Sequence, residues 1–228
     1  MNQPQPSHYR YRIRFAKKGL MRFVGHQELM RVFERAMRRC GLRIRPREGF
    51  RTKVRLSFPL SLALGFEADE EVFQVDLQER VDPEELKERL QAELPDGLQL
   101  GSVRAVAPHV RARVLETHYR VPVPEQAERL VNERMAQWQT GQEIHVSSCR
   151  KGVTRTITLR PGLCRLERCA QHVEFALRHD TKQTGVRPID VLHWLGLEPW
   201  LREGLVVTRT KVLLEDETQN STKPGTGR

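Results

Sequence analysis

Two hydrophobic patterns follow each other near the start of the chain. Residues 9–15 alternate large apolar side chains with arginine, in the order Tyr-Arg-Tyr-Arg-Ile-Arg-Phe. Successive side chains of a strand point to opposite faces, so this pattern predicts a strand with one buried and one basic face. From residue 26 the apolar positions recur at helical spacing until Gly41, which predicts a helix over residues 26–40. Its apolar positions are Leu29, Val32, Phe33, Ala36, Met37 and Cys40.

The rest of the first half predicts three strands and a second helix. Strands are expected over residues 54–60, 71–77 and 98–107. Between the last two, Asp82-Pro83-Glu84-Glu85 combines an N-cap, a first-turn proline and an acid at the third helical position. These residues predict a helix that ends before Pro95-Asp96-Gly97. The resulting order, βαββαβ, is that of the ferredoxin-like unit.

The second half predicts a similar order from weaker patterns. The expected elements are a strand over 114–121, a helix over 125–138, a hairpin of 143–148 with 156–160, a strand over 169–179, a helix over 188–195 and a strand over 205–214. The fold class predicted is therefore α+β, with two ferredoxin-like (βαββαβ) halves in tandem over residues 8–108 and 109–214. Residues 215–228 lack a run of apolar positions and are expected to form a disordered tail.

The distribution of charge adds a functional expectation. The 228 residues include 39 Lys+Arg and 29 Asp+Glu, a net charge of +10, but residues 1–60 alone hold 16 basic and 3 acidic residues. Of the basic residues 31 are arginine, whose planar guanidinium grips phosphate with two hydrogen bonds. A GC-rich genome would explain the excess of arginine over lysine, but not its crowding into one segment. The crowding favours a polyanionic partner such as RNA over a merely solvated surface.

Other compositional features narrow the class of protein. No apolar run at the start resembles a signal peptide and none is long enough for a membrane span, so a cytoplasmic protein with reduced thiols and no membrane partner is expected. Cys149, Cys164, Cys169 and His172 lack the tight Cys-x2–4-Cys spacing of structural zinc sites. P-loop, GxGxxG, HExxH and GxSxG motifs are also absent. We therefore expect no metal and no cofactor.

His26 and several basic turns are the candidate site residues. His26 follows Gly25 at the start of the arginine-rich helix, where it could act as a general acid or base beside a bound phosphate, or simply hydrogen-bond a neighbouring loop. The turns around Arg150-Lys151, Arg160 and Arg187 could present a guanidinium to phosphate, or be ordinary turns and helix starts. The predicted nucleic-acid contacts are Arg12, Arg14, Lys18, Arg22, Arg31, Arg35, Arg38, Arg39, Arg150, Lys151, Arg160 and Arg187.

Several segments resemble a known family. They include Lys18-Gly-Leu-Met-Arg-Phe-Val-Gly-His26, Arg35-Ala-Met-Arg-Arg-Cys-Gly41, Gly49-Phe50, Leu56-Ser-Phe-Pro-Leu60, Leu159-Arg-Pro161, Gly185-Val-Arg-Pro-Ile-Asp-Val-Leu192 and Val207-Thr-Arg-Thr210. Together they resemble the radical-SAM-linked family of uncharacterised bacterial proteins, which are fused to, or encoded beside, a radical SAM protein. The chain departs from the family pattern at Glu48, at residues 51–54 and at Thr158, where the family usually has serine, Asn-Pro-x-Pro and aspartate. The resemblance implies a radical SAM protein as a partner.

Three functions remain open from the sequence. The leading hypothesis is an RNA-binding accessory protein that acts with the radical SAM partner in RNA modification or translation-linked processing. The second is a metal-independent endoribonuclease that uses His26 as acid or base; here the tandem ferredoxin-like halves are similar in architecture to CRISPR repeat-processing endoribonucleases. The third is a protein–protein adaptor that docks on the radical SAM enzyme.

Overall fold

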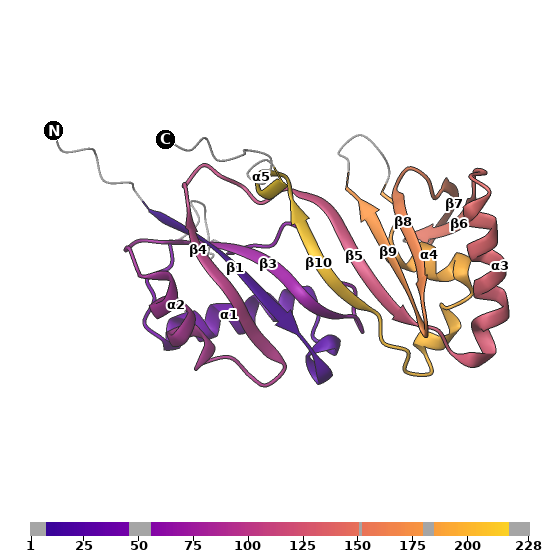
Figure 1. The fold of residues 1–228 in the computed structure, drawn as a ribbon. Helices are drawn as coiled ribbons and strands as arrows, with labels where there is room; N and C mark the ends of the chain where they lie inside the picture. The colour runs from indigo at the N-terminus through magenta and orange to yellow at the C-terminus, as the bar shows by residue number, and fades with distance from the viewer. Residues whose placement is uncertain (1–7, 46–55, 151, 180–184, 219–228) are drawn as a thin grey trace, which may run out of the picture. The chain divides into compact units, whose positions relative to one another are not determined.

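The computed structural model describes residues 8–45, 56–150, 152–179 and 185–218. These residues form two compact units, one ending at Arg113 and the other spanning Val114–Thr218 (Figure 1). The division lies close to the predicted boundary after residue 108. Each unit combines helices with antiparallel strands, so the protein is of the mixed α/β kind.

The first unit has the predicted order of strands and helices. Its elements are β1 (Tyr9–Lys17), the 3-10 helix η1 (Gly19–Phe23), α1 (His26–Arg39), β2 (Leu56–Ser57), β3 (Glu67–Leu77), α2 (Pro83–Gln91) and β4 (Leu98–Val106). The strands are hydrogen-bonded in the order β4-β1-β3-β2, and every pair is antiparallel. The predicted strand over 54–60 is shorter here, since only Leu56–Ser57 pair, while residues 54 and 55 lie outside the described residues.

The alternation in β1 and the helical spacing in α1 meet in one core. Ile13 and Phe15 of β1 and Phe33 and Met37 of α1 are each at most 1% exposed. The rings of Phe15 and Phe33 lie 5.0 Å apart in an edge-to-face arrangement, which is favourable for aromatic pairs. The core fixes which face of α1 points outward, and this face carries the helix arginines.

The other face of β1 is less open than its alternation predicts. Arg10 is 9% exposed, and its guanidinium donates two hydrogen bonds to the buried carboxylate of Asp76, at 2.6 and 3.0 Å. It also donates to the carbonyl of Val110, from the segment that follows β4. The basic face of β1 is therefore partly covered by residues of the same unit, Asp76 and Val110.

The second unit contains a hairpin that stands outside its main sheet. Its elements are β5 (Val114–Pro122), η2 (Glu125–Ala127), α3 (Glu128–Gln139), β6 (His145–Arg150), β7 (Val153–Thr158), β8 (Leu163–Cys169), β9 (His172–Arg178), α4 (Pro188–Leu195), η3 (Pro199–Leu201), β10 (Thr208–Leu214) and α5 (Glu215–Thr218). Four strands pair antiparallel in the order β10-β5-β9-β8, whereas β6 pairs only with β7.

Two expectations for this unit need correction. The sequence analysis predicted the hairpin but no strand over residues 163–169, where β8 occupies the sheet edge beside β9. It also began the disordered tail at residue 215, but Glu215–Thr218 form the short helix α5; residues 219–228 lie outside the described residues. None of the described helices is both long and apolar enough to cross a membrane.

Candidate nucleic-acid interface

The outward face of α1 carries four arginines. Arg31, Arg35, Arg38 and Arg39 are all exposed, because the apolar positions of the helix are turned to the core. Residues three or four positions apart are neighbours on a helix surface, so the four guanidinium groups share one side of α1. The sequence analysis named all four as nucleic-acid contacts.

A hollow of about 570 Å³ lies beside these arginines, between α1 and the residues that follow α2. Arg35 and Arg39 line it together with Glu93, and apolar side chains complete the wall: Val32, Ala92, Leu94 and Pro95. The guanidinium of Arg39 donates from Nε to Oε2 of Glu93 at 2.5 Å. A cationic rim around an apolar wall suits a nucleotide, whose phosphate is charged and whose base has apolar faces.

The four arginines differ in how far they are engaged within the protein. Arg31 forms an ion pair with Glu28 one turn earlier, and Arg39 pairs with Glu93. For Arg35 and Arg38 no ion pair is recorded with any of the described residues. Ion pairs on an exposed surface contribute little stability, so Arg31 and Arg39 can exchange their carboxylate for a phosphate. Arg35 and Arg38 can bind a phosphate without breaking an ion pair with the described residues.

His26 lies at the start of α1 as predicted, but it faces an aromatic cluster. Its ring meets the ring of Phe58 edge to face at 5.3 Å, and Phe58 stacks on Phe73 at 5.1 Å. The buried amine of Lys17 donates to the carbonyl of Val24, two residues before His26, at 2.8 Å. No hydrogen bond or ion pair of His26 is recorded among the described residues. The observed contacts are those of a residue that positions the start of the helix.

Other predicted contacts of the first unit are tied to carboxylates that follow residue 60. Arg14 pairs with Glu70, and Lys18 pairs with Asp69 and, at 3.5 Å, with Glu67. Arg22 lies 3.8 Å from Glu67 and stacks over the ring of Phe23 at 4.7 Å. Arg12 requires a correction, because it is only 1% exposed and offers no surface for an external phosphate.

The predicted contacts of the second unit serve its packing. The guanidinium carbon of Arg160 lies 3.5 Å from the centre of the Trp138 ring, and Nη2 donates to the Trp138 carbonyl at 2.8 Å. Arg187 is the N-cap of α4 and donates to Asp190, which is 3% exposed, and to Ser148 of β6. Lys151 and the side chain of Arg150 lie outside the described residues.

The Arg187–Asp190 pair perturbs the pKa of the carboxyl group. Burial alone would raise the pKa of Asp190, but hydrogen bonds from the side chain and backbone N–H of Arg187 and from the Ser148 hydroxyl outweigh it. The pKa of Asp190 is therefore lower than its ordinary value, and the pKa of Arg187 is raised, mainly by the side-chain hydrogen bond to Asp190. Both groups are charged at neutral pH and hold α4 to the hairpin strand β6.

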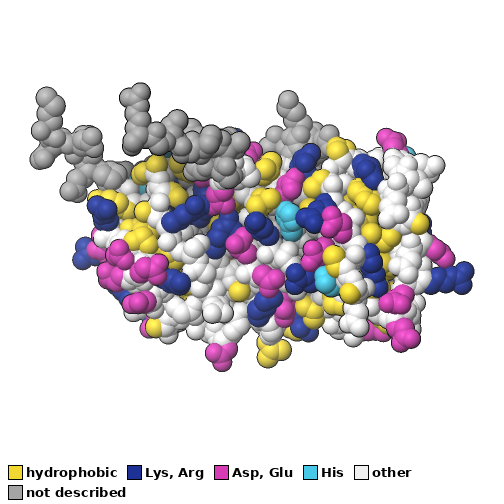
Figure 2. All heavy atoms as spheres, in the orientation of Figure 1, with side chains coloured by type: hydrophobic (Ala, Val, Ile, Leu, Met, Phe, Trp, Pro, Cys, Tyr) yellow, Lys and Arg dark blue, Asp and Glu magenta, His cyan; other side chains and the backbone are white. Residues whose placement is uncertain are grey.

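The sequence analysis missed the acidic partners of the basic segment. Glu67, Asp69, Glu70 and Glu93 are far from their arginines and lysine along the chain, and nothing local predicts these pairs. On the face seen in Figure 2, dark-blue and magenta side chains are intermingled and do not separate into areas of one sign. Folding thus neutralises much of the charge that is segregated in the sequence.

An exposed apolar patch on the first unit was missed as well. Leu20 and Phe23 are 84% and 56% exposed, and they stand three residues apart on η1, where such side chains share one face. Leu64 is 66% exposed, and the next residue, Gly65, donates its backbone N–H to the carbonyl of Arg22 at 2.9 Å. The two segments that carry the three exposed side chains are thus joined by a backbone hydrogen bond, and one of them is the Lys18–His26 motif.

The described residues contain no cluster of three or more His, Cys, Asp or Glu side chains that could hold a metal ion. The four cysteines are all free thiols.

Comparisons with known proteins complete the description. No curated protein matches the chain. A structure described as an unknown protein from Galdieria sulphuraria is similar at 14% sequence identity with a TM-score of 0.28, and the match covers 91% of this chain and 98% of that one. The model of the family described as "Uncharacterized protein conserved in bacteria (DUF2344)" matches residues 10–188. Because this match takes in both units and well over half of the sequence, the chain belongs to that family.

Proposed function

We propose that this protein is an RNA-binding accessory protein that acts in the cytoplasm beside a radical SAM enzyme, in RNA modification or translation-linked processing. The observation that carries the RNA-binding part is the exposed face of α1, which presents four arginines, two of which, Arg35 and Arg39, line a hollow with an apolar wall. The radical SAM partner comes from the resemblance of the Lys18–His26 and Arg35–Gly41 segments to the radical-SAM-linked family.

A ferredoxin-like description of both units belongs to the same proposal. The first unit supports it with the strand order β4-β1-β3-β2, in which each β-α-β crossover skips one position. The second unit supports it with the order β10-β5-β9-β8, provided that the β6–β7 hairpin is treated as an insertion after α3. In this description α1 is the first crossover helix of the first unit, and its outer face is turned away from the sheet.

The test compares two double variants with the same change in net charge. Arg35→Ala/Arg38→Ala removes the two α1 arginines without a recorded ion pair, and Arg129→Ala/Arg202→Ala removes two exposed arginines of the second unit. Binding of a fluorescent single-stranded RNA of mixed sequence is measured over a range of salt concentrations. The α1 variant should bind more weakly, and the slope of log K against log salt should become shallower by about 1.4, or 0.7 for each lost phosphate contact.

The matched variant separates a local interface from general attraction. If RNA binds through α1, Arg129→Ala/Arg202→Ala keeps nearly the wild-type slope. Equal losses in both variants would mean that only net charge matters, and an unchanged slope in the α1 variant would contradict the proposed interface.

Incubation of the protein with total RNA in EDTA addresses the endoribonuclease alternative. Acid–base cleavage needs one group to activate the 2′-hydroxyl and another to protonate the leaving oxygen. We expect discrete RNAs to stay intact. Reproducible 2′,3′-cyclic phosphate ends that disappear in His26→Ala would instead establish the nuclease.

The exposed apolar patch favours the adaptor as a second candidate function. Large apolar side chains exposed together are typical of protein interaction sites. In a pull-down with the purified radical SAM partner, Leu20→Asp/Leu64→Asp should lose binding. Val153→Asp is the matched control, because Val153 is 53% exposed in the hairpin of the second unit. If Leu20→Asp/Leu64→Asp still binds the radical SAM partner, the adaptor function is contradicted.

A further inference from the structure

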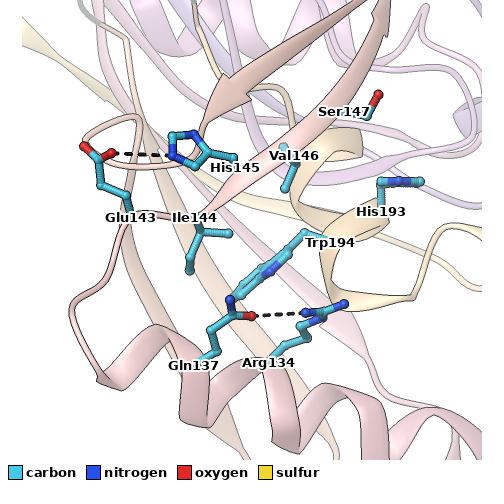
Figure 3. A pocket seen from close by; sticks show the side chains of 9 residues that line it. All are labelled: Arg134, Gln137, Glu143, Ile144, His145, Val146, Ser147, His193 and Trp194. Carbon is cyan, nitrogen blue, oxygen red and sulfur yellow. Dashed lines mark hydrogen bonds and ion pairs between the residues drawn. The ribbon is translucent and has the colours of Figure 1, made fainter.

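The second unit contains a hollow of about 260 Å³ that the proposed function does not use. Figure 3 shows its lining, which comes from three elements: Arg134 and Gln137 from α3, residues 143–147 from β6 and the loop before it, and His193 and Trp194 from α4. All of these residues belong to one unit, so the hollow depends on its own packing alone.

Two hydrogen-bond donors beside the hollow have no acceptor among the described residues. Trp194 is 6% exposed, and its indole Nε1 is shielded from solvent without a partner. Nε of Arg134 is shielded and without a partner in the same way. Another nitrogen of this guanidinium, Nη1, donates to Oε1 of Gln137 at 3.1 Å, as the dashed line in Figure 3 shows. Buried donors are almost always satisfied in folded proteins, so this pair indicates that an acceptor belongs here.

The other groups around the hollow favour an acceptor with negative charge. Arg134 carries a full positive charge, and His145 and Ser147 add polar groups that can donate hydrogen bonds. The one carboxylate in the lining, Glu143, is 76% exposed at its side chain, so solvent screens its charge, and it lies 3.5 Å from Nε2 of His145. His193 is held outward by its contact with Glu198 at 2.6 Å.

The apolar part of the lining limits the size and shape of the occupant. Ile144 and Val146 are 2% and 6% exposed, and with the Trp194 ring they form a wall that offers no hydrogen bonds. The volume is several times the roughly 30 Å³ that one water molecule occupies in the liquid. It is also slightly below the range of about 300–1,000 Å³ that is usual for drug-sized ligands. The occupant is thus larger than a water molecule and smaller than most cofactors.

We infer that this hollow binds a small oxyanion, the carboxylate or phosphate group of a free small molecule, which accepts hydrogen bonds from Arg134 and the Trp194 indole. A slight shift of either side chain opens its shielded nitrogen to the ligand. Arg134 supplies charge and a planar pair of donors, which match the two oxygens of such a group. The indole fixes the position of the anion against the apolar wall.

The three tryptophans of the chain make the inference directly measurable. In a sample labelled with ¹⁵N-tryptophan, the indole signals of Trp138, Trp194 and Trp200 are assigned with single Trp→Phe variants. Inorganic phosphate and acetate are titrated separately, with sodium chloride at matched ionic strength as the reference. The Trp194 signal should shift and saturate with at least one of the two anions, whereas Trp138 and Trp200 should follow the chloride reference.

Two arginine variants on the same helix decide whether the effect is local. Arg134→Gln should weaken binding by about tenfold or more, because it removes the charge-assisted donors. Arg129→Gln removes an arginine whose side chain is 92% exposed on α3 and should bind as the wild type does. The comparison of phosphate with acetate identifies which oxyanion the hollow prefers.

A calorimetric measurement with Trp194→Phe covers the case in which Arg134→Gln fails to fold. This variant keeps an aromatic ring in the wall and loses the N–H donor, so the affinity for the preferred anion should fall. The inference is overturned if the Trp194 signal responds to neither anion beyond the chloride reference, or if both variants bind as the wild type does. Because RNA binding is measured on α1, failure here leaves the proposed function standing.

Discussion

The arginines of α1 in the first unit and those that contact α4 and Trp138 in the second unit have different roles. Residues 1–113 contain 22 basic and 15 acidic residues, a balance of +7, whereas residues 114–218 contain 15 and 14, a balance of +1. In the first unit the arginines of α1 are exposed, and their ion pairs lie at the surface. In the second unit Arg187 and Arg160 cap a helix and cover a tryptophan.

The comparison distinguishes arginines that stabilise the fold from arginines that are available to bind a ligand, a difference that a count of basic residues does not show. A guanidinium that donates to a buried carboxylate belongs to the fold, and its removal costs stability. A guanidinium that pairs only with an exposed carboxylate can bind another anion instead, and its removal weakens the affinity for that anion. Of the next three predictions, which run from the largest expected effect to the smallest, the first and the third test this distinction.

Loss of Asp190 should have the largest effect on stability. In Asp190→Ala the Arg187 guanidinium loses its buried partner, and we expect the free energy of unfolding to fall by about 3 kcal/mol, at the lower end for a broken buried pair because the guanidinium keeps some access to water. All three tryptophans belong to the second unit, so tryptophan fluorescence in a urea titration reports on this unit. A loss below about 1 kcal/mol, as for a surface pair, would break the contrast between the units.

The pH dependence of the difference in unfolding free energy between the wild type and Asp190→Ala is the control for this prediction. The pKa of Asp190 is lower in the folded state, so its contribution is fully present above the pKa of the unfolded chain and is lost as the pH falls through the folded pKa. The stability difference between wild type and Asp190→Ala should therefore be constant from about pH 7 to pH 5 and shrink below about pH 4. A difference that grows on acidification would contradict the assigned direction.

A substitution at Gly97 should have the second largest effect and acts on the first unit. Gly97 has a φ of +86°, and a Cβ there would lie 2.6 Å from the carbonyl oxygen of Lys18. We expect Gly97→Ala to cost about 2 kcal/mol, measured by hydrogen exchange of the β1 amides. Gly101→Ala is the matched control in β4, since its added Cβ would meet the Arg14 carbonyl oxygen at an ordinary 3.5 Å. If both variants lose the same stability, the positive φ is not the cause.

Of the three substitutions, Glu93→Gln should have the smallest effect on stability, and it should raise the affinity for RNA. The side chains of Glu93 and Arg39 are 34% and 53% exposed, and such a pair contributes at most about 1 kcal/mol. Glu93→Gln should therefore leave the unfolding midpoint nearly unchanged. It also removes a negative charge from the α1 hollow, so RNA affinity at low salt should rise. Weaker RNA binding in this variant would place the RNA elsewhere on the protein.

Local patterns in the sequence were enough for some elements and misleading for others. The alternation in β1 and the spacing in α1 could be read directly, since each depends on residues a few positions apart. In β8 the register shifts between Leu163 and Arg165, so that Leu163 and Leu166 are both buried although they are three residues apart. A bulge of this kind destroys the period of two that identifies a strand in the sequence.

The candidate site was predictable only in the part that lies on one helix. The α1 arginines follow from the helical spacing, but the partner of Arg39 is 54 residues away and the wall of the hollow comes partly from residues after α2. The oxyanion hollow is an extreme case, since Arg134, His145 and Trp194 come from three elements and none belongs to a recognised motif. Proximity of this kind arises only from the tertiary fold.

The β6–β7 hairpin, which lies outside the main sheet, also contains a cysteine that can be labelled selectively. Cys149 is exposed in β6, whereas the other three cysteines are half-buried, and burial raises the pKa of the Cys40 and Cys164 thiols. A maleimide dye should therefore react first at Cys149, since the thiolate is the reactive form. Because β6 pairs only with β7, a dye at this position leaves the four-stranded sheet intact. Labelling of the native sequence thus yields a fluorescent reporter on the strand that also lines the oxyanion hollow.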